Sequence, residues 1–315
     1  MSNTIMISGA TGFIGRRLTS RFVEEGQQVI ALSRRPEKYR SYFPEKVEFL
    51  HWDKLHSSSW SPPTNITAII NLAGENIAGG IWTRKRKQKL IDSRLQPTRT
   101  LVNAVHNMPV KPEIFIQMSA IGYYGWGEDN LLDENSPAGK GFLAELTQQW
   151  EAAASEINKL GVKLMIARTG LVVGKGGGLL SRITPPFRFY LGGHFGKGDQ
   201  WMSWIHLDDV VNAIQFLLKN KPSYTVYNLT SPQAEKARDF FRALGRELHR
   251  PSWLHLPESL LKVALGEMAK ETILITQRVY PAHLIKAGFE FRYPELTQAL
   301  ASLVNSQGSI KTLTD

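Results

Sequence analysis

The chain has 315 residues, 42% of them hydrophobic and 21% charged, which is typical of a globular protein and excludes a disordered or collagen-like chain. It contains no cysteine, which excludes disulfides and thiolate chemistry, and its 38 Lys and Arg against 28 Asp and Glu favour anionic partners. No apolar run reaches the ~18 residues of a membrane span and the N-terminus lacks a signal-peptide pattern, so we expect a cytoplasmic protein with no membrane partner.

Short apolar segments alternate with helical patterns through the first half of the chain. The expected strands are Thr4–Ser8, Val29–Ser33, Val47–His51, Ala68–Leu72, Ile114–Ser119 and Val162–Ala167. The expected helices are Phe13–Glu25, a stretch from Thr83 to His106, and Phe142–Leu160. Buried strands alternating with helices predict an α/β fold, a doubly wound parallel sheet covered on both faces.

The pattern changes after Gly170. Glycine-rich loops precede an expected helix over His206–Leu218 and a strand over Thr225–Leu229, and the chain reads as mainly helical from Pro251. We therefore expect a cofactor domain over residues 1–174, completed by parts of 200–230. The rest, residues 175–315, is expected to form a smaller substrate lobe with a helical segment at about 250–300. In His206-x-Asp208-Asp209 we expect a helix-capping acid beside a partly buried histidine rather than a catalytic pair.

A glycine-rich turn lies between the first strand and the first helix. It reads Gly9-Ala10-Thr11-Gly12-Phe13-Ile14-Gly15. Glycines at this spacing allow a tight turn and a close approach to a pyrophosphate, for which the helix N-terminus supplies free N–H groups. The alternative is a purely structural turn. We predict a dinucleotide site that includes Gly9, Thr11, Gly12, Phe13, Ile14 and Gly15.

The end of the second strand indicates which dinucleotide is bound. It reads Leu32-Ser33-Arg34-Arg35, without the acid that would bind the ribose 2′-hydroxyl of NAD. A guanidinium group suits the 2′-phosphate of NADP instead. The alternative is that both arginines are solvated loop charges. We predict NADP as the cofactor.

Five motifs together resemble a known family. GATGFIG (Gly9–Gly15) is similar to the first turn of the extended short-chain dehydrogenase/reductases. The further blocks that resemble one branch are NLAGENI (Asn71–Ile77), SAIGYYG (Ser119–Gly125), the stretch Pro185–Asp209, and GFEFRYPEL (Gly288–Leu296). That branch is the atypical, sugar-nucleotide epimerase-like family of the YfcH type, with its small C-terminal domain. The resemblance implies a Rossmann-type NADP domain and a small-molecule substrate such as a nucleotide sugar, and it leaves the oligomeric state open.

The resemblance also implies roles for residues outside the glycine turn. The expected cofactor contacts are Ser33 and Arg34 at the 2′-phosphate, Asp53 at the adenine, Leu72 and Ala73 beside the cofactor, Lys89 and Arg94 at phosphates, and Val172 near the nicotinamide. In this interpretation the remaining basic run, Arg84 to Lys87, is only solvated.

The catalytic pattern of that superfamily is incomplete in this chain. Ser119 matches its serine, but Phe142 and Leu146 occupy the positions of the Tyr-x-x-x-Lys dyad, and neither side chain can transfer a proton. Tyr123 is our candidate for the missing acid, with Tyr124 as the alternative. The third possibility is that neither tyrosine acts as an acid and that both rings only pack as large apolar groups. No residue spacing indicates a metal site.

Three functions remain open. The first is an NADP-dependent oxidoreductase or nucleotide-sugar epimerase. The second is a catalytically weak NADP-binding sensor or scaffold, which the missing dyad favours. The third, a nucleic-acid-binding protein that uses the basic run, is disfavoured because the run is short and the glycine turn already accounts for an anionic ligand.

Overall fold

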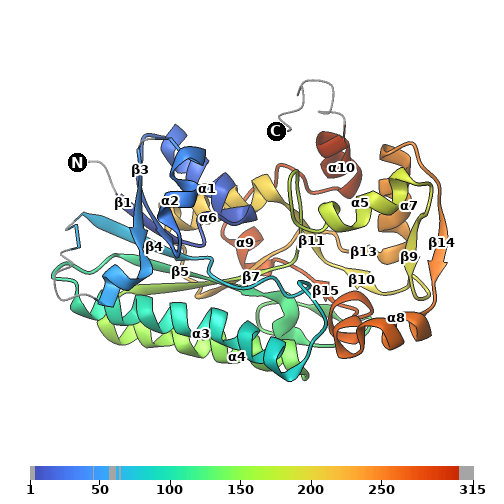
Figure 1. Ribbon diagram of the computed structural model, residues 1–315, viewed down its shortest axis with the longest axis horizontal. Helices are drawn as coiled ribbons and strands as arrows, with labels where there is room; N and C mark the ends of the chain where they lie inside the picture. Colours follow the sequence, from blue (N-terminus) through green and yellow to red (C-terminus); the bar gives the residue numbers. More distant parts are fainter. Residues whose placement is uncertain (1–3, 45, 57–61, 64, 305–315) are drawn as a thin grey trace.

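The computed structural model describes residues 4–44, 46–56, 62–63 and 65–304, which are built around a seven-stranded parallel sheet (Figure 1). In spatial order the strands are β12 (Val226–Leu229), β7 (Lys163–Thr169), β5 (Ile114–Ala120), β4 (Ile66–Asn71), β1 (Thr4–Ser8), β2 (Gln28–Ser33) and β3 (Val47–His51). The chain order reverses beside β1, so the carboxyl end of β1 is the switch point where such sheets bind ligands. The predicted doubly wound parallel sheet is confirmed.

Helices cover both faces of the sheet. Successive side chains of each strand point to opposite faces, and both sets are therefore buried. The covering helices are α1 (Phe13–Glu24), α3 (Arg84–Asn107), α4 (Phe142–Ser155) and α6 (Leu207–Asn220). Ile116 and Met118 of β5 share a core cluster with α1 and α6, whereas Phe115 packs on the opposite face with Leu101 of α3 and Ala154 of α4. Figure 1 shows α3 and α4 running side by side beneath the sheet.

The remaining elements are short. The helices are α2 (Pro36–Tyr39), α5 (Leu180–Arg188), α7 (Ala237–Glu247), α8 (Glu258–Leu265), α9 (Ala282–Lys286) and α10 (Leu296–Val304). Single turns of 3₁₀ helix span Arg40–Tyr42, Trp52–His56, Ile121–Tyr124 and Glu156–Leu160, and a π-helical turn spans Ala269–Ile273. The other strands are β6 (Leu131–Leu132), β8 (Leu171–Val173), β9 (Gly192–Phe195), β10 (Trp201–Met202), β11 (Trp204–His206), β13 (Glu235–Lys236), β14 (Ser252–Leu256) and β15 (Arg278–Val279).

A second, smaller core lies in the lobe at the other end of the molecule (Figure 1). There α5, α7 and α10 surround Phe187, Trp204 and Phe240, which are almost fully buried. Four two-stranded pairs complete the lobe: β8 with β11, β9 with β14, β6 with β15, and β10 with β13. The lobe therefore has an apolar core of its own, apart from the clusters that cover the sheet.

The C-terminal part of the chain also returns to the sheet. Leu284 and Phe289 belong to the same core cluster as α1 and α6. The Asp209 carboxylate of α6 accepts the backbone N–H groups of Arg292 and Tyr293 at 2.8 and 2.9 Å. The division into residues 1–174 and 175–315 stays a prediction, and the chain ends 1–3 and 305–315 lie outside the described residues.

Three expected elements differ in detail. The helix expected to reach Leu160 is α-helical only to Ser155 and then continues as a 3₁₀ turn before Gly161, which has a φ of 74°. The segment expected to be mainly helical begins with β14, whose alternating exposure follows the two-residue period of a strand. His206 itself caps α6: its Nδ1 accepts the Asp208 N–H at 3.0 Å, and burial lowers its pKa to about 4.

No helix among the described residues is both long and apolar enough to cross a membrane.

Candidate functional site

The glycine turn at the carboxyl end of β1 is packed too closely for larger residues. Gly9 has a φ of +68°, and a Cβ there would lie 2.7 Å from the Leu72 carbonyl oxygen. The N–H of Gly12 donates to the Gly9 carbonyl at 2.9 Å, and a Cβ on Gly15 would lie 2.1 Å from that same oxygen. The turn therefore requires glycine at these positions, as a close-approach phosphate loop does.

The N-terminus of α1 follows this turn directly. Its N-cap residue is Gly12, so no side chain accepts a hydrogen bond from the first-turn N–H groups. Thr11 and Ile14 are half-buried beside it, and Gly12 is exposed. Free N–H groups and the positive end of the helix dipole make this end of α1 suited to a pyrophosphate.

Phe13 lies where the turn meets the lobe. Its ring packs against the glycine-rich loop 174–178: added Cβ atoms at Gly174, Gly177 and Gly178 would lie 2.8, 2.4 and 2.7 Å from ring carbons of Phe13. The carbonyl of Val172, just before this loop, accepts the Leu179 N–H at 3.1 Å. Phe13 and Val172 are therefore brought together, with Phe13 acting as the packing surface that positions the loop over the turn.

The end of β2 presents two free arginine side chains. Arg34 and Arg35 are exposed, and their guanidinium groups form no hydrogen bond or ion pair with any other described residue. Ser33 is buried, and its Oγ accepts the Arg35 N–H at 3.1 Å, which fixes the turn. A free guanidinium at the end of β2 can form charge-assisted hydrogen bonds with a ribose 2′-phosphate.

His51 joins this turn to the end of β3. Its Nε2 lies 3.1 Å from the Arg34 carbonyl oxygen, and its Nδ1 accepts the Asp53 N–H at 3.2 Å. The Asp53 side chain is 88% exposed. His51 was not among the expected site residues, although it ends a predicted strand, beside Ser33 of the neighbouring strand. Arg34 and Asp53 thus lie on one rim of the site.

The loop after β4 is fixed from below by a buried polar network. Ser8 Oγ donates to Asn71 Oδ1 at 2.5 Å and accepts the Leu72 N–H at 3.1 Å, while Ala73 N–H donates to Asn71 Oδ1 at 3.3 Å. Asn71 in turn donates to Gln117 Oε1 at 2.8 Å. Leu72 and Ala73 are therefore held rigidly beside the glycine turn.

The two basic residues of α3 that were expected at phosphates, Lys89 and Arg94, have protein partners. Arg94 is buried, donates to the carbonyl oxygens of Leu90 and Glu75 at 3.1 Å each, and has its pKa lowered by burial to about 10. Lys89 is 61% exposed and lies 3.5 Å from the Glu75 carboxylate. Because the Arg94 guanidinium is occupied by protein carbonyls, its observed contacts hold the loop at Glu75 in place.

The expectation that Arg84 to Lys87 are only solvated is wrong for two of them. Arg86 pairs with the Glu75 carboxylate at 3.1 Å, which lowers the pKa of Glu75. Lys87 forms an ion pair with Glu267 and lies 4.7 Å from the centre of the Phe142 ring. The run therefore ties α3 to the loop after β4 and to the C-terminal part of the chain.

Ser119 is part of a buried ion-pair network. Its hydroxyl donates to Glu151 Oε1 of α4 at 2.6 Å. Arg168 of β7, paired with Ser119 in register, holds both oxygens of the same carboxylate at 2.9 and 2.8 Å. All three residues are at most 8% exposed. Since the Ser119 hydroxyl donates its hydrogen bond to Glu151, its Oγ keeps lone pairs that can accept a hydrogen bond.

The two tyrosines that follow Ser119 have different surroundings. Tyr124 is buried, donates to Asn228 at 2.8 Å and accepts from Arg168 at 3.1 Å, and burial raises its pKa to about 12. Tyr123 is half-buried, with the Arg168 guanidinium 3.3 Å from its ring centre, and its hydroxyl has no hydrogen-bond partner among the described residues. Only Tyr123 keeps a hydroxyl group free for a ligand.

The two positions of the missing dyad are filled by packing. Phe142 and Leu146 belong to a cluster with Trp82 of the α3 entrance and Met268 of the C-terminal segment. The Phe142 and Trp82 rings pack edge to face, with their ring centres 5.0 Å apart. In addition, the Glu271 carboxylate accepts the N–H groups of Phe142 and Leu143 at 2.8 and 2.7 Å. The C-terminal segment therefore docks where the dyad would lie.

Sequence reasoning missed Glu151, Arg168, Asn228 and Glu271. Arg168 left one signal, a charged residue inside an otherwise apolar strand. The other three lie far apart in the sequence and meet at the site only in the folded chain: Glu151 on α4, Asn228 on the edge strand β12 and Glu271 in the C-terminal segment. No cluster of three metal-binding side chains occurs among the described residues.

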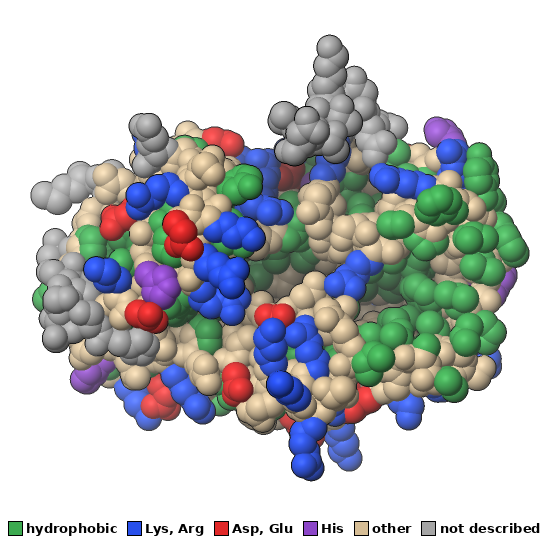
Figure 2. Space-filling view, in the orientation of Figure 1, with side chains coloured by type: hydrophobic (Ala, Val, Ile, Leu, Met, Phe, Trp, Pro, Cys, Tyr) green, Lys and Arg blue, Asp and Glu red, His purple; other side chains and the backbone are tan. Residues whose placement is uncertain are grey.

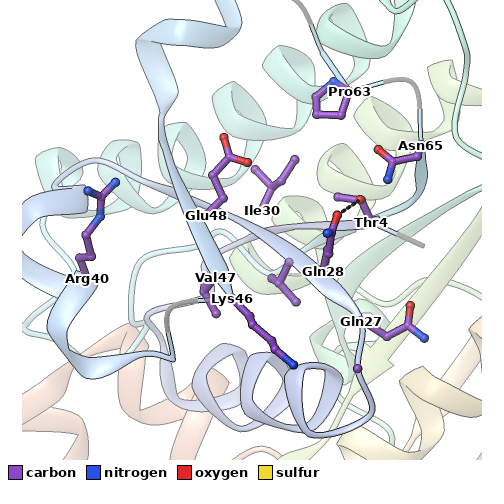
Figure 3. A pocket seen from close by; sticks show the side chains of 12 residues that line it. Thr4, Gln27, Gln28, Ile30, Arg40, Lys46, Val47, Glu48, Pro63 and Asn65 are labelled. Carbon is purple, nitrogen blue, oxygen red and sulfur yellow. Dashed lines mark hydrogen bonds between the residues drawn. The ribbon is translucent and has the colours of Figure 1, made fainter. Parts of the chain in front are cut away.

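The surface supports a ligand site between the two halves. Figure 2 shows a hollow between the sheet domain and the lobe, with Lys and Arg side chains around its mouth and hydrophobic ones inside. A separate pocket lies at the amino ends of β1 to β3, where Thr4 donates to Gln28 at 3.2 Å and Arg40, Lys46 and Glu48 form the wall (Figure 3). That pocket is at the sheet edge opposite to the glycine turn and belongs to neither the turn nor Ser119.

Comparison with known proteins places the chain in a family. Residues 5–230 match the NAD dependent epimerase/dehydratase family, and residues 256–303 match a domain of unknown function, DUF1731. "Epimerase family protein SDR39U1 homolog, chloroplastic" from Arabidopsis thaliana is 39% identical, over 96% of this chain and 86% of that protein. "Epimerase family protein YfhF" from Bacillus subtilis is 33% identical, over 97% and 99%.

A solved structure agrees with these sequence matches. Human epimerase family protein SDR39U1 (isoform 2), crystallised with NADPH, superposes with a TM-score of 0.86 at 29% identity, covering 96% of this chain and 99% of that one. The resemblance drawn from the motifs is therefore confirmed. The chain belongs to the NAD dependent epimerase/dehydratase family of extended short-chain dehydrogenases/reductases and carries the C-terminal DUF1731 domain.

Proposed function

We propose that this protein is an NADP-dependent oxidoreductase or epimerase that works without the Tyr-Lys dyad. The observation that carries the proposal is the glycine turn, in which Gly9 and Gly15 leave no room for a Cβ, next to the free Arg34 side chain at the end of β2. The NADPH bound to the human relative supports the same cofactor. When bound, the nicotinamide of NADP would donate a hydride to the substrate or accept one from it.

Ser119 and Tyr123 are the groups that we assign to the substrate. Ser119 Oγ, whose proton is held by Glu151, accepts a hydrogen bond from a substrate hydroxyl. Tyr123, whose hydroxyl is free, exchanges the proton of the reacting oxygen. Arg168 orients both, through Glu151 on one side and through the Tyr123 ring on the other. The substrate class is a small alcohol or carbonyl compound that fits between the sheet and the lobe.

Cofactor choice tests the first half of this proposal. Arg34→Ala is expected to weaken NADPH binding by about 10- to 100-fold, the effect of one charge-assisted contact to phosphate, while NADH binding changes little. Parallel fluorescence titrations of both nucleotides measure the difference. Arg40→Ala changes an exposed arginine at the opposite edge of the sheet; it is the control and should leave both affinities unchanged. Equal losses for NADPH and NADH would remove Arg34 from the 2′-phosphate site.

A second candidate, a catalytically weak NADP-binding sensor or scaffold, is favoured by the packing of Phe142 and Leu146 against Met268. Tyr123→Phe separates the two functions. In an enzyme, this variant should lose NADPH oxidation with carbonyl substrates by about 100-fold or more while keeping its NADPH affinity. Wild-type protein that binds NADPH and oxidises it with no member of a broad carbonyl panel would instead support the sensor.

A further inference from the structure

Four large apolar side chains protrude from the outer end of the lobe. Phe189, Tyr190 and Leu191 form the turn after α5 and are 75%, 56% and 50% exposed, and Trp253 of β14 is 56% exposed. The Trp253 Nε1–H donates to the Tyr190 carbonyl at 2.9 Å, which joins the turn to the strand. We call these four residues the lobe-tip patch. They lie at the end of the molecule where Figure 2 shows hydrophobic side chains gathered over α5, β9 and β14.

The backbone holds this patch outward in two neighbouring turns. Tyr190 and His249 both have positive φ values, 62° and 52°, a conformation that residues with a side chain adopt only when their surroundings impose it. The Leu191 N–H donates to the Pro186 carbonyl at 2.9 Å, and β14 pairs with β9 directly behind. Phe189, Tyr190 and Leu191 are thus presented on a fixed turn, and Trp253 on the adjoining strand β14, instead of being folded back onto the nearby lobe core.

The rim of the patch is basic. Arg188 ends α5, Arg246 lies in the last turn of α7, and the Arg250 guanidinium lies 4.7 Å from the centre of the Tyr190 ring. None of the three forms an ion pair with a carboxylate of the described residues. Their charges are therefore available to an anionic partner.

We propose that the lobe-tip patch docks onto an anionic lipid surface. Aromatic side chains on convex turns, backed by arginines, are suited to the interface between headgroups and acyl chains. A protein partner would need complementary pockets around the aromatic anchors, whereas a bilayer interface accepts side chains that project from a turn and from a two-stranded pair, as these four do. The net charge of +10 adds a long-range attraction to anionic headgroups. Such docking needs no membrane-spanning segment, and vesicle binding would overturn our expectation that the protein has no membrane partner.

Vesicle co-sedimentation of the full-length protein tests this proposal. We expect binding to vesicles of equal amounts of phosphatidylglycerol and phosphatidylcholine, and little binding to phosphatidylcholine alone. The double variant Phe189→Ser/Trp253→Ser should lower the affinity by more than about 10-fold, since two large side chains no longer insert. The matched control is Tyr42→Ser/Val110→Ser, which removes two side chains that are 74% and 51% exposed elsewhere, and it should bind like wild type.

The charge of the rim is tested in the same assay. Arg188→Glu/Arg246→Glu should also lower binding by about 10-fold or more, because each arginine near an anionic surface contributes to attraction. Arg99→Glu/Lys85→Glu on the exposed side of α3 makes the same change in net charge and should have a much smaller effect. Added salt should weaken wild-type binding.

Three results would overturn the proposal. The first is a wild-type protein that does not sediment with anionic vesicles. The second is binding that both patch variants retain in full. The third is a dimer, measured by sedimentation equilibrium without lipid, that Phe189→Ser/Trp253→Ser dissociates, since the patch would then be an interface between two copies. None of these depends on NADP binding or turnover, so the docking surface and the proposed reaction can fail separately.

Discussion

Glu151→Ala is expected to lower the free energy of unfolding by about 3–5 kcal/mol, the cost of leaving one partner of a buried ion pair without its counter-charge. Arg168 would keep its guanidinium at 4% exposure with no carboxylate to hold it, and the Ser119 hydroxyl would lose its acceptor. Chemical denaturation monitored by tryptophan fluorescence measures the change, and an unaltered slope with denaturant would show that the transition itself is the same.

Two control variants show whether the loss of stability comes from the unpaired buried charge. Glu113→Ala removes the acid of the Lys221 ion pair, whose side chains are 60% and 49% exposed, and should cost less than about 1 kcal/mol. The double variant Glu151→Met/Arg168→Met should recover most of the loss, since it leaves no buried charge unpaired. If Glu151→Ala cost no more than Glu113→Ala, the network would not stabilise the fold and would not fix Ser119 and Tyr123.

The features that the sequence predicted are those encoded locally. The glycine turn, the strands before and after it and the missing acid after β2 lie within a short stretch, where residue type and period directly report the backbone conformation. For the same reason the parallel sheet could be predicted: each buried strand has its own apolar run. The family followed from motifs that are likewise continuous in the chain.

The features that the sequence missed depend on distant partners. The sequence alone does not reveal the ion pair of Lys87, because its partner Glu267 lies 180 positions away. Glu271 caps α4 from 128 positions beyond Leu143, so no window of sequence joins the two. β14 was interpreted as the start of a helical region because its pairing with β9 was invisible, although its exposure alternates. In each case tertiary contact outweighs the local pattern.

The candidate catalytic residues show the same limit. Ser119 could be placed from the motif, but the direction of its hydrogen bond depends on Glu151, which α4 carries to the strand. Tyr123 and Tyr124 are adjacent and alike in sequence. Asn228 of the edge strand β12 and Arg168 of β7 distinguish them, because both bind the hydroxyl of Tyr124. The assignment of Tyr123 therefore depends on the order of strands in the sheet and not on the motif.

Gly15→Ala is expected to destabilise the protein by about 3–4 kcal/mol and to abolish NADPH binding, although alanine is the better helix former by about 1 kcal/mol. The added Cβ would lie 2.1 Å from the Gly9 carbonyl oxygen and 2.7 Å from Ala10 Cα. Both are backbone atoms, so the clash can be relieved only by opening the turn that would hold the pyrophosphate. Thermal and chemical unfolding, with NADPH titration of the folded fraction, measure the two effects.

Gly12→Ala in the same turn is the matched control for that clash. Its Cβ would meet only the Gly9 carbonyl oxygen, at 3.2 Å, and its φ of −76° suits any residue, so a loss below about 1 kcal/mol is expected. A Gly15→Ala protein as stable as wild type would show that the turn can open at little cost. In that event the close packing of Gly9, Gly15 and Leu72 could not be what shapes the site, and the NADP assignment would depend on Arg34 and on the likeness to the NADPH-bound relative.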